Sequence, residues 1–280
     1  MNALACVSHP RLGSTIYTCF ELEAKVGSVR SLSSFAVIFS TCLPLSAQWI
    51  HYPTPGIPRT TDGKPNLSAP APRTPDGKPD VSGIWVAVNV KYLNDLAADG
   101  VEVPMRPWAQ ALYKQRLENM GKGRPSERCL TRGVVDFDTI PMNLKFIQTP
   151  GTIAVLYEEY NHYRQIFLDG RPLPQPTQPA YLGYSIGRFE GDTLVVDTTG
   201  FNDIGWLDNN GHPQTESLHV TERFHRRDFG HMDLQITIDD MKAYTRPWTV
   251  TVAGFNYLAD EELIENICEN EKDVPHLVGK

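Results

Sequence analysis

The chain has 280 residues, with 26 basic and 33 acidic side chains and a formal net charge of −7. Its longest run of basic residues is the pair Arg226 and Arg227, whereas a nucleic acid or an anionic membrane requires a basic face. The charge pattern argues against both as partners and favours a small-molecule ligand.

The amino-terminal region has the order of a secretory signal. Arg30 precedes the apolar run 35–45, and the small residues Ser46 and Ala47 follow it before Gln48. The run is too short to span a bilayer, which needs about 20 residues, and its flanks are those of an export signal. We expect residues 1–47 to be a leader and the protein to be periplasmic or extracellular. The alternative is a buried helix of a cytosolic protein.

Two cysteines, Cys129 and Cys268, follow the leader. In an oxidising compartment they favour one disulfide, which would join the carboxy-terminal tail to the front of the domain. Two separately buried thiols are the alternative, because the sequence supplies no distance between them.

A proline-rich segment with an imperfect repeat follows the leader directly. It reads Pro-Arg-Thr-Thr-Asp-Gly-Lys-Pro from residue 58 and Pro-Arg-Thr-Pro-Asp-Gly-Lys-Pro from residue 72. Asp-Gly is a turn signal, and the prolines prevent a regular helix or a central strand. We predict that residues 48–80 form an extended arm, lying on the domain or partly free, with a plain linker favoured over a docking segment.

The folded domain is expected over residues 81–280, a length that suits one large domain or two small ones. A helix is predicted over 104–120 from the spacing of Trp108 and Leu112, and it ends at Gly121. The segment 126–141 is predicted to be a loop.

Eight later segments are rich in β-branched and aromatic residues and are separated by turns such as Gly191-Asp192. The predicted strands are 145–148, 152–158, 162–168, 184–190, 193–199, 218–225, 232–238 and 248–255. Short consecutive strands joined by hairpins favour a mainly β fold, an antiparallel up-and-down β-barrel with a short amino-terminal helical flank. A sandwich is the alternative.

The strand alternation places one acidic residue among apolar ones. If Phe224 faces Met232, then Leu218, Val220, Phe224 and Glu222 share the apolar face. A carboxyl group there has a raised pKa unless a cation pairs with it, and a raised pKa suits a general acid or base. Glu222 is therefore a candidate catalytic residue. The alternatives are pairing with Arg or main-chain amides, or a register slip that exposes it.

The loop over residues 200–216 is longer than an ordinary hairpin connection, and such loops are often functional. His212 and Asp203 are candidates for an acid/base pair, and Trp206 could cover the mouth of the barrel. The alternative is a surface loop with one packed tryptophan, because Asn209-Asn210-Gly211 is a sequence that favours an ordinary turn.

A second polar cluster lies at the predicted hairpin tip 157–164. Here we expect a glutamate to lie beside His162, as half of a catalytic pair or as an ordinary solvated hairpin end. The residues proposed to bind a ligand are Trp206, His162, Tyr157, Glu158 and His219.

Motifs for metals and common cofactors are missing from the sequence. Glu216, His219 and Glu222 are spaced for a helix, but they fall in a strand-like segment that would separate His219 from Glu222. There is no Gly-x-Ser-x-Gly, phosphate-binding loop or dinucleotide-binding glycine pattern after a strand. No metal and no cofactor are expected.

Several motifs resemble a family of exported bacterial proteins. They are Phe-Ile-Gln-Thr-Pro-Gly from residue 146, Leu-Tyr-Glu-Glu-Tyr-Asn-His-Tyr-Arg-Gln-Ile-Phe-Leu-Asp-Gly-Arg from 156, Gly-Arg-Phe-Glu-Gly-Asp-Thr-Leu-Val-Val-Asp-Thr-Thr-Gly-Phe from 187 and Tyr-Thr-Arg-Pro-Trp from 244. The resemblance runs from about Gln48 to the carboxyl end. It implies export and one domain, and it supplies no activity or catalytic residues. The opening Ser82-Gly-Ile-Trp85 is also similar to the Gly-x-Trp start of lipocalin-type barrels.

Three functions fit these observations. The first is a lipocalin-like barrel that binds a small apolar or mixed-polarity molecule. The second is an isomerase, lyase or hydrolase that uses Glu222, or His212 with Asp203. The third is a structural or interaction protein that uses the proline-rich arm.

Overall fold

The computed structural model describes residues 3–11, 14–22, 53–175 and 178–268, and the chain divides into two compact units, Met1–Gln48 and Trp49–Lys280. In the first unit, β1 (Ala3–Arg11) and β2 (Ser14–Leu22) form an antiparallel hairpin. The apolar run 35–45 and the expected cleavage point lie outside the described residues, so the leader stays a prediction.

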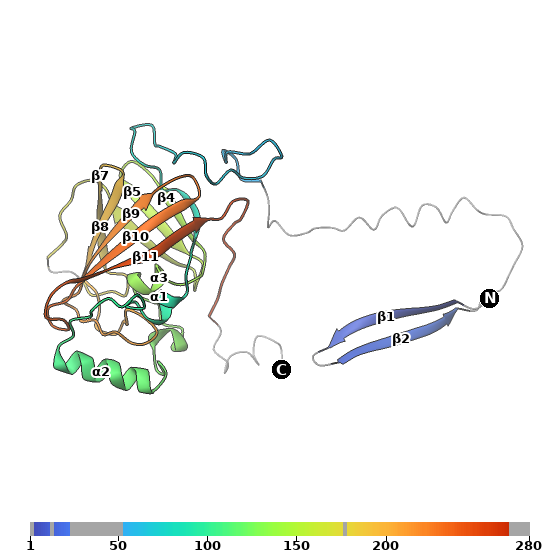
Figure 1. The fold of residues 1–280 in the computed structure, drawn as a ribbon, viewed down its shortest axis with the longest axis horizontal. Helices are drawn as coiled ribbons and strands as arrows, with labels where there is room; N and C mark the ends of the chain where they lie inside the picture. The colour runs from blue at the N-terminus through green and yellow to red at the C-terminus, as the bar shows by residue number, and fades with distance from the viewer. Residues whose placement is uncertain (1–2, 12–13, 23–52, 176–177, 269–280) are drawn as a thin grey trace, which may run out of the picture. The chain divides into compact units, whose positions relative to one another are not determined.

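In its described residues the second unit contains a closed barrel of nine strands, ordered around the barrel as they follow in the chain (Figure 1). Buried side chains alternate with more exposed ones along strands such as β9 and β10, the pattern of a wall with one face on the interior. The strands are β3 (Gly83–Ala87), β4 (Leu144–Gln148), β5 (Thr152–Tyr157), β6 (His162–Phe167), β7 (Tyr184–Glu190), β8 (Thr193–Thr199), β9 (His219–Arg226), β10 (His231–Asp239) and β11 (Trp248–Tyr257).

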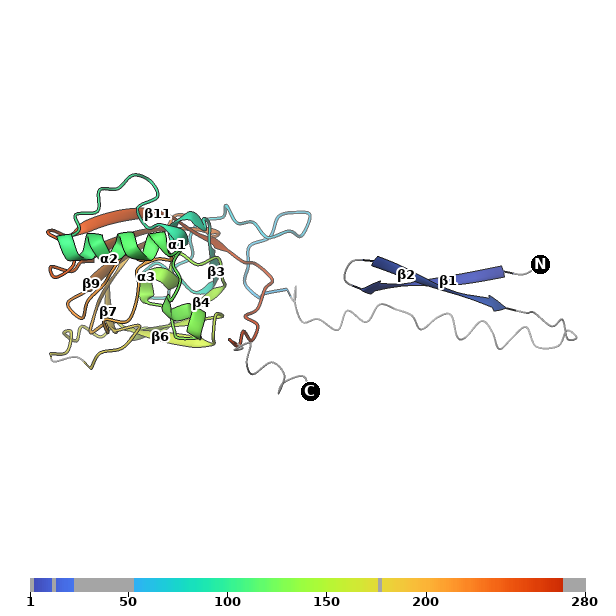
Figure 2. The ribbon, with the colours of Figure 1, turned by 90° about the horizontal axis from the view of Figure 1, so that it is seen from below.

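Short helices gather at one end of the barrel, which we call the helical end (Figures 1 and 2). They are α1 (Lys91–Asn94), α2 (Pro107–Glu118), the 3₁₀ helix η1 (Pro125–Arg128) and α3 (Val134–Phe137). The predicted helix is present as α2, which begins at a proline, a residue suited to the first helical position. No helix of the described residues has the length and hydropathy needed to cross a bilayer.

The segment 126–141 was predicted to be a loop, and the structure differs there. It contains part of η1 and all of α3, whose four residues are buried. These helices are too short to show a helical period in the sequence, and α3 is stabilised by packing against the core.

The barrel is confirmed, but its strands are not all antiparallel. β6 and β7 run parallel, with Ile166 beside Ser185 and Phe167 beside Ile186. A closed ring with an odd number of strands cannot alternate direction at every step, so at least one neighbouring pair must be parallel. The connection 168–183 satisfies this condition by returning along the barrel before β7 begins.

The proline-rich arm lies against the other end of the barrel, which we call the arm end (Figure 1). The main-chain N–H groups of Phe229 and Gly230, in the β9–β10 turn, donate to carbonyls of Ala69 and Leu67. Both repeats form the same turn, and an arginine from each pairs with an aspartate of the domain. The pairs are Arg59 with Asp260 at 2.6 Å and Arg73 with Asp192 at 2.9 Å.

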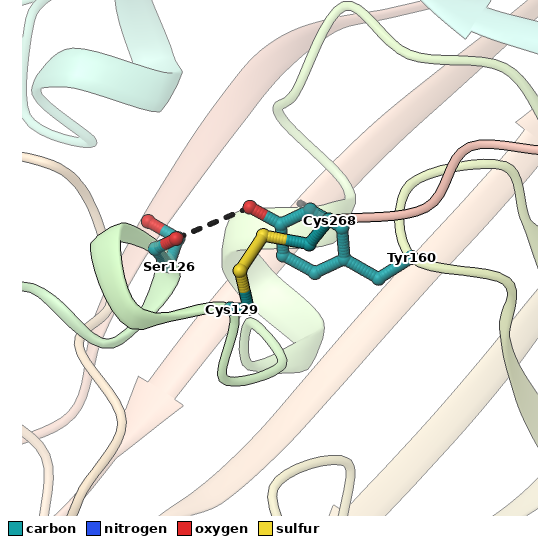
Figure 3. Close-up of a disulfide and its surroundings, with 4 residues drawn as sticks. All are labelled: Ser126, Cys129, Tyr160 and Cys268. Atoms are coloured by element: carbon teal, nitrogen blue, oxygen red, sulfur yellow. Dashed lines mark hydrogen bonds between the residues drawn. A yellow bond between two sulfur atoms is a disulfide. The ribbon is translucent and has the colours of Figure 1, made fainter. Parts of the chain in front are cut away.

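A disulfide joins Cys129, which follows η1, to Cys268 near the carboxyl end (Figure 3). The two Cα atoms lie 5.5 Å apart, although the residues are separated by 139 positions. Beside the bridge, the Tyr160 hydroxyl donates to the Ser126 carbonyl at 3.1 Å. The bridge thus holds the carboxy-terminal segment against the helical end.

Candidate functional site

An ion pair between Arg164 of β6 and Glu222 of β9 lies inside the barrel towards the helical end. Two guanidinium nitrogens donate to the two carboxylate oxygens at 2.7 and 2.5 Å, and the side chains are 3% and 0% exposed. Arg164 also donates to the hydroxyls of Ser185 and Thr198 at 2.8 and 2.7 Å. Glu222 is therefore a buried carboxylate that is held by a cation.

A second carboxyl group, that of Asp138, faces this ion pair from the residue after α3. Burial, and then the negative charge of Glu222, raise the pKa of Asp138 well above its ordinary value. Its Oδ2 has no hydrogen-bond partner among the described residues. Burial thus favours the protonated form of Asp138 beside the ion-paired Glu222, and two neighbouring carboxyl groups in different environments suit acid–base chemistry.

Tyr157, at the end of β5, adds a hydroxyl to the same cluster. Burial raises the pKa of the Tyr157 phenol, and the positive charge of Arg164 opposes this increase. The phenol oxygen is buried and has no hydrogen-bond partner in the described part of the chain. Asp138 and Tyr157 therefore place two buried polar oxygens beside the ion pair.

His162 lies opposite Tyr157 in the β5–β6 register. Phe137 stacks on the Tyr157 ring at 4.2 Å and meets the His162 ring edge-on at 6.1 Å. Burial lowers the pKa of His162, and its Nε2 is buried with no partner among the residues described. Burial thus favours the neutral imidazole, although the negative charge of Glu159 opposes this effect.

This register differs from the expectation that a glutamate would lie beside His162. Tyr160 and Asn161 both adopt left-handed backbone conformations, with φ of 59° and 54°, so the turn takes four residues. Glu158 therefore lies in the turn, outside the paired residues of β5 and β6. Its carboxylate accepts from the Asn143 amide at 3.0 Å and from the main-chain N–H of Ile264 at 3.3 Å.

A pocket of about 250 Å³ lies between this hairpin and the carboxy-terminal segment. Its walls are mainly apolar, with polar groups from the hairpin turn. It is lined by Leu156, Tyr157, Glu158, Asn161, His162, Tyr163, Leu263 and Ile264. Three of the five residues proposed from the sequence to bind a ligand, Tyr157, Glu158 and His162, thus meet at one pocket, which we call the tail pocket.

The predicted pair of His212 with Asp203 does not form. Asp203 is exposed, whereas His212 Nδ1 lies 2.5 Å from Asp208 Oδ2 and its ring stacks on Tyr113 of α2 at 4.2 Å. The turn at residues 209–211 folds the loop back and brings Asp208, not Asp203, against the imidazole. This pair ties the long loop to the helices.

Trp206 and His219 lie outside the tail pocket. Trp206 is buried at the helical end, beneath the guanidinium of Arg116 at 4.1 Å from its ring. His219 lies on the outer face of β9, where its Nε2 is 3.1 Å from Asp197. Neither residue is among those that line the tail pocket with Tyr157 and His162.

Ligand atoms of Asp95, Asp208 and His212 lie within 4.8 Å of one another, close enough to hold a metal ion. The carboxylate of Asp208, however, already accepts four N–H groups. These are the main-chain groups of Leu96, Gly211 and His212 and the ring Nδ1 of His212. With its lone pairs engaged, Asp208 fits a structural role better than metal coordination.

Sequence reasoning missed Arg164 and Asp138. Arg164 shares the alternation of β6 with His162 and Ile166, a signal that could have placed it inside the barrel. Asp138 follows the apolar and acidic stretch Val-Val-Asp-Phe, whose buried helix is too short to recognise from periodicity. No family model matches the sequence, and no curated protein matches it significantly.

Proposed function

We propose that the protein binds a small molecule of mixed polarity in the tail pocket. The observation that carries this proposal is the pocket itself, whose wall is mainly apolar and whose lining includes the polar side chains of Glu158, Asn161 and His162. Its volume of about 250 Å³ lies just below the usual range for small-molecule sites, roughly 300 to 1,000 Å³. A small ligand with an apolar body and one polar group suits these dimensions.

Titration with the neutral dye N-phenyl-1-naphthylamine, followed by its fluorescence, tests this proposal. Ile264→Asp places a charge in the pocket wall, and Ile147→Asp is the matched control on β4, because the two isoleucines are 46% and 42% exposed. We expect the first substitution to weaken dye binding at least tenfold and the second less than twofold. Equal effects, or no binding to the unaltered protein, would refute the proposal.

We also propose that the protein is exported. The basic, apolar and small-residue order of residues 30–48 supports this, and so does the Cys129–Cys268 disulfide, since such bonds persist in oxidising compartments. Intact-mass analysis of the protein from its own cells would then show the loss of about the first 47 residues. A full-length mass in the cytosolic fraction would contradict export.

Acid–base catalysis is a second candidate function, supported by the buried Asp138, whose pKa is raised, beside the ion-paired Glu222. Candidate substrates are screened directly for hydrolysis, elimination or isomerisation, because Asp138 does not line the tail pocket on which the dye reports. Asp138→Asn removes the acid and should lower turnover at least a hundredfold, whereas Asp203→Asn, on an exposed loop, should not. Equal turnover in both variants, or no reaction with any ligand, would exclude this function.

A further inference from the structure

A second cavity, of about 310 Å³, lies at the arm end, between the second repeat of the arm and the carboxyl end of β9. Its apolar wall consists of Pro70, Ala71, Pro72 and Pro79. Its polar lining comes from Arg73, His225, Arg226 and Arg227, with Asp192 as the acidic member. Cationic side chains therefore dominate this cavity, which we call the arm cavity.

Arg226 is the buried cation of the arm cavity, with 4% exposure. In the described residues its guanidinium hydrogen-bonds only to main-chain carbonyls, those of Asp80, Ser82, Asp228 and Phe229. Its ring contacts are also neutral, with the guanidinium 4.8 Å from the Trp85 ring and 4.9 Å from that of Phe229. No carboxylate of the described residues therefore neutralises it by direct contact. Burial lowers the pKa of Arg226 to about 10, an effect that the more distant Asp80 and Asp228 partly oppose, so the side chain keeps its charge at neutral pH.

The two outer arginines are placed to contact a ligand directly. Arg73 pairs with Asp192 at 2.9 Å and Arg227 with Asp233 at 3.1 Å, and all four of these side chains are about half exposed. Such exposed pairs are weak and exchange readily with another anion. A guanidinium also offers two parallel donors that match a carboxylate or sulfonate.

We infer that the arm cavity is a binding site for a small organic anion. The anionic group lies against Arg227, the buried charge of Arg226 adds to the attraction, and the apolar body packs on the prolines of the arm. This site is separate from the tail pocket and does not depend on the function proposed for it. The arm then acts as one wall of a binding site.

Two dyes that differ by one sulfonate test the inference on the full chain. They are 8-anilinonaphthalene-1-sulfonate and its neutral counterpart N-phenyl-1-naphthylamine. Arg227→Gln removes a cation that lines the cavity, and Arg223→Gln removes one from the outer face of β9, where Arg223 pairs with Glu190. Both variants change the net charge equally.

We expect Arg227→Gln to weaken binding of the sulfonate about tenfold and Arg223→Gln less than twofold, with binding of the neutral dye unchanged in both. Two outcomes would overturn the inference. One is an equal effect of the two substitutions on the sulfonate, which would indicate a diffuse surface charge. The other is an equal loss of both dyes in Arg227→Gln, which would indicate an apolar site without anion recognition.

Discussion

At the scale of single residues, the Arg164–Glu222 pair has an energetic cost that the barrel must offset. Moving two charges out of water is expensive, and a well-satisfied buried pair often stabilises no more than apolar residues of the same volume. Removing one partner is worse, because the other charge is left buried and unpaired. The pair therefore restricts the substitutions that the barrel interior tolerates at positions 164 and 222.

We expect Glu222→Gln to lower the free energy of unfolding by about 3–5 kcal/mol, measured by urea denaturation. The control is Arg223→Gln on the same strand, which breaks an exposed pair with Glu190 and should cost less than about 1 kcal/mol. Similar losses in the two variants would show that Glu222 is not buried as described.

Asp138 gives a prediction about pH. Its pKa in the folded protein is raised by burial and by Glu222, whereas in the unfolded chain it is about 3.9. As pH rises above about 4, the unfolded chain releases this proton first, so the stability of the folded protein falls until its own raised pKa is reached.

The amide in Asp138→Asn cannot ionise, so this variant should lack the loss of stability that Asp138 causes as the pH rises. The free energy of unfolding of the unaltered protein minus that of the variant should therefore fall by roughly 1.4 kcal/mol per pH unit above pH 4. Urea denaturation of both proteins at half-unit steps from pH 4.5 measures the slope. A difference that does not change with pH would show that Asp138 has an ordinary pKa.

At the scale of elements, the long loop 200–218 is held by a carboxylate at its centre. Asp208 accepts the main-chain N–H groups of Gly211 and His212, which follow it in the turn, and that of Leu96 near α1. This carboxylate therefore helps to join the loop to the helices that cover the barrel.

We expect Asp208→Ala to lower the free energy of unfolding by about 3 kcal/mol, because several buried N–H groups lose their acceptor. Asp203→Ala in the same loop changes an exposed side chain and should stay within about 0.5 kcal/mol of the unaltered protein. Thermal and urea unfolding measure both. A larger effect at Asp203 would support the acid/base pair that the sequence suggested.

At the scale of the whole molecule, the disulfide closes a loop of 139 residues. In the chain-entropy model a closure of this length stabilises the folded state by up to about 5 kcal/mol. Replacing both cysteines by serine should lower the free energy of unfolding by an amount of this order. It should also weaken dye binding in the tail pocket, since Leu263 and Ile264 of the tethered segment form one wall.

Reduction of the unaltered protein with dithiothreitol provides the matched comparison, because it breaks the same bond without a substitution. Both treatments should shift urea unfolding in the same direction. If stability and dye affinity remain unchanged in both, the carboxy-terminal segment is held by its other contacts alone.

The sequence by itself determined eight of the nine barrel strands and the helix at 104–120, and it favoured a place for Glu222 on the apolar face. It did not predict β3 as a strand. These features follow from local periodicity, because a strand with one wet face must alternate apolar and polar residues. The same reasoning identified Tyr157, Glu158 and His162, which share one hairpin. Residues so close in the chain are brought together by local structure alone.

Only the tertiary structure decided which groups meet across the barrel. Arg164 and Glu222 are 58 positions apart, and nothing in either strand identifies the other as its partner before the barrel closes. Closure with nine strands also required the parallel β6–β7 pair. The short helix α3 is stabilised by burial rather than by propensity, and it sets Asp138 beside Glu222. The residues of the candidate site thus meet only when the barrel closes, whereas the strands that carry most of them are determined by the local sequence.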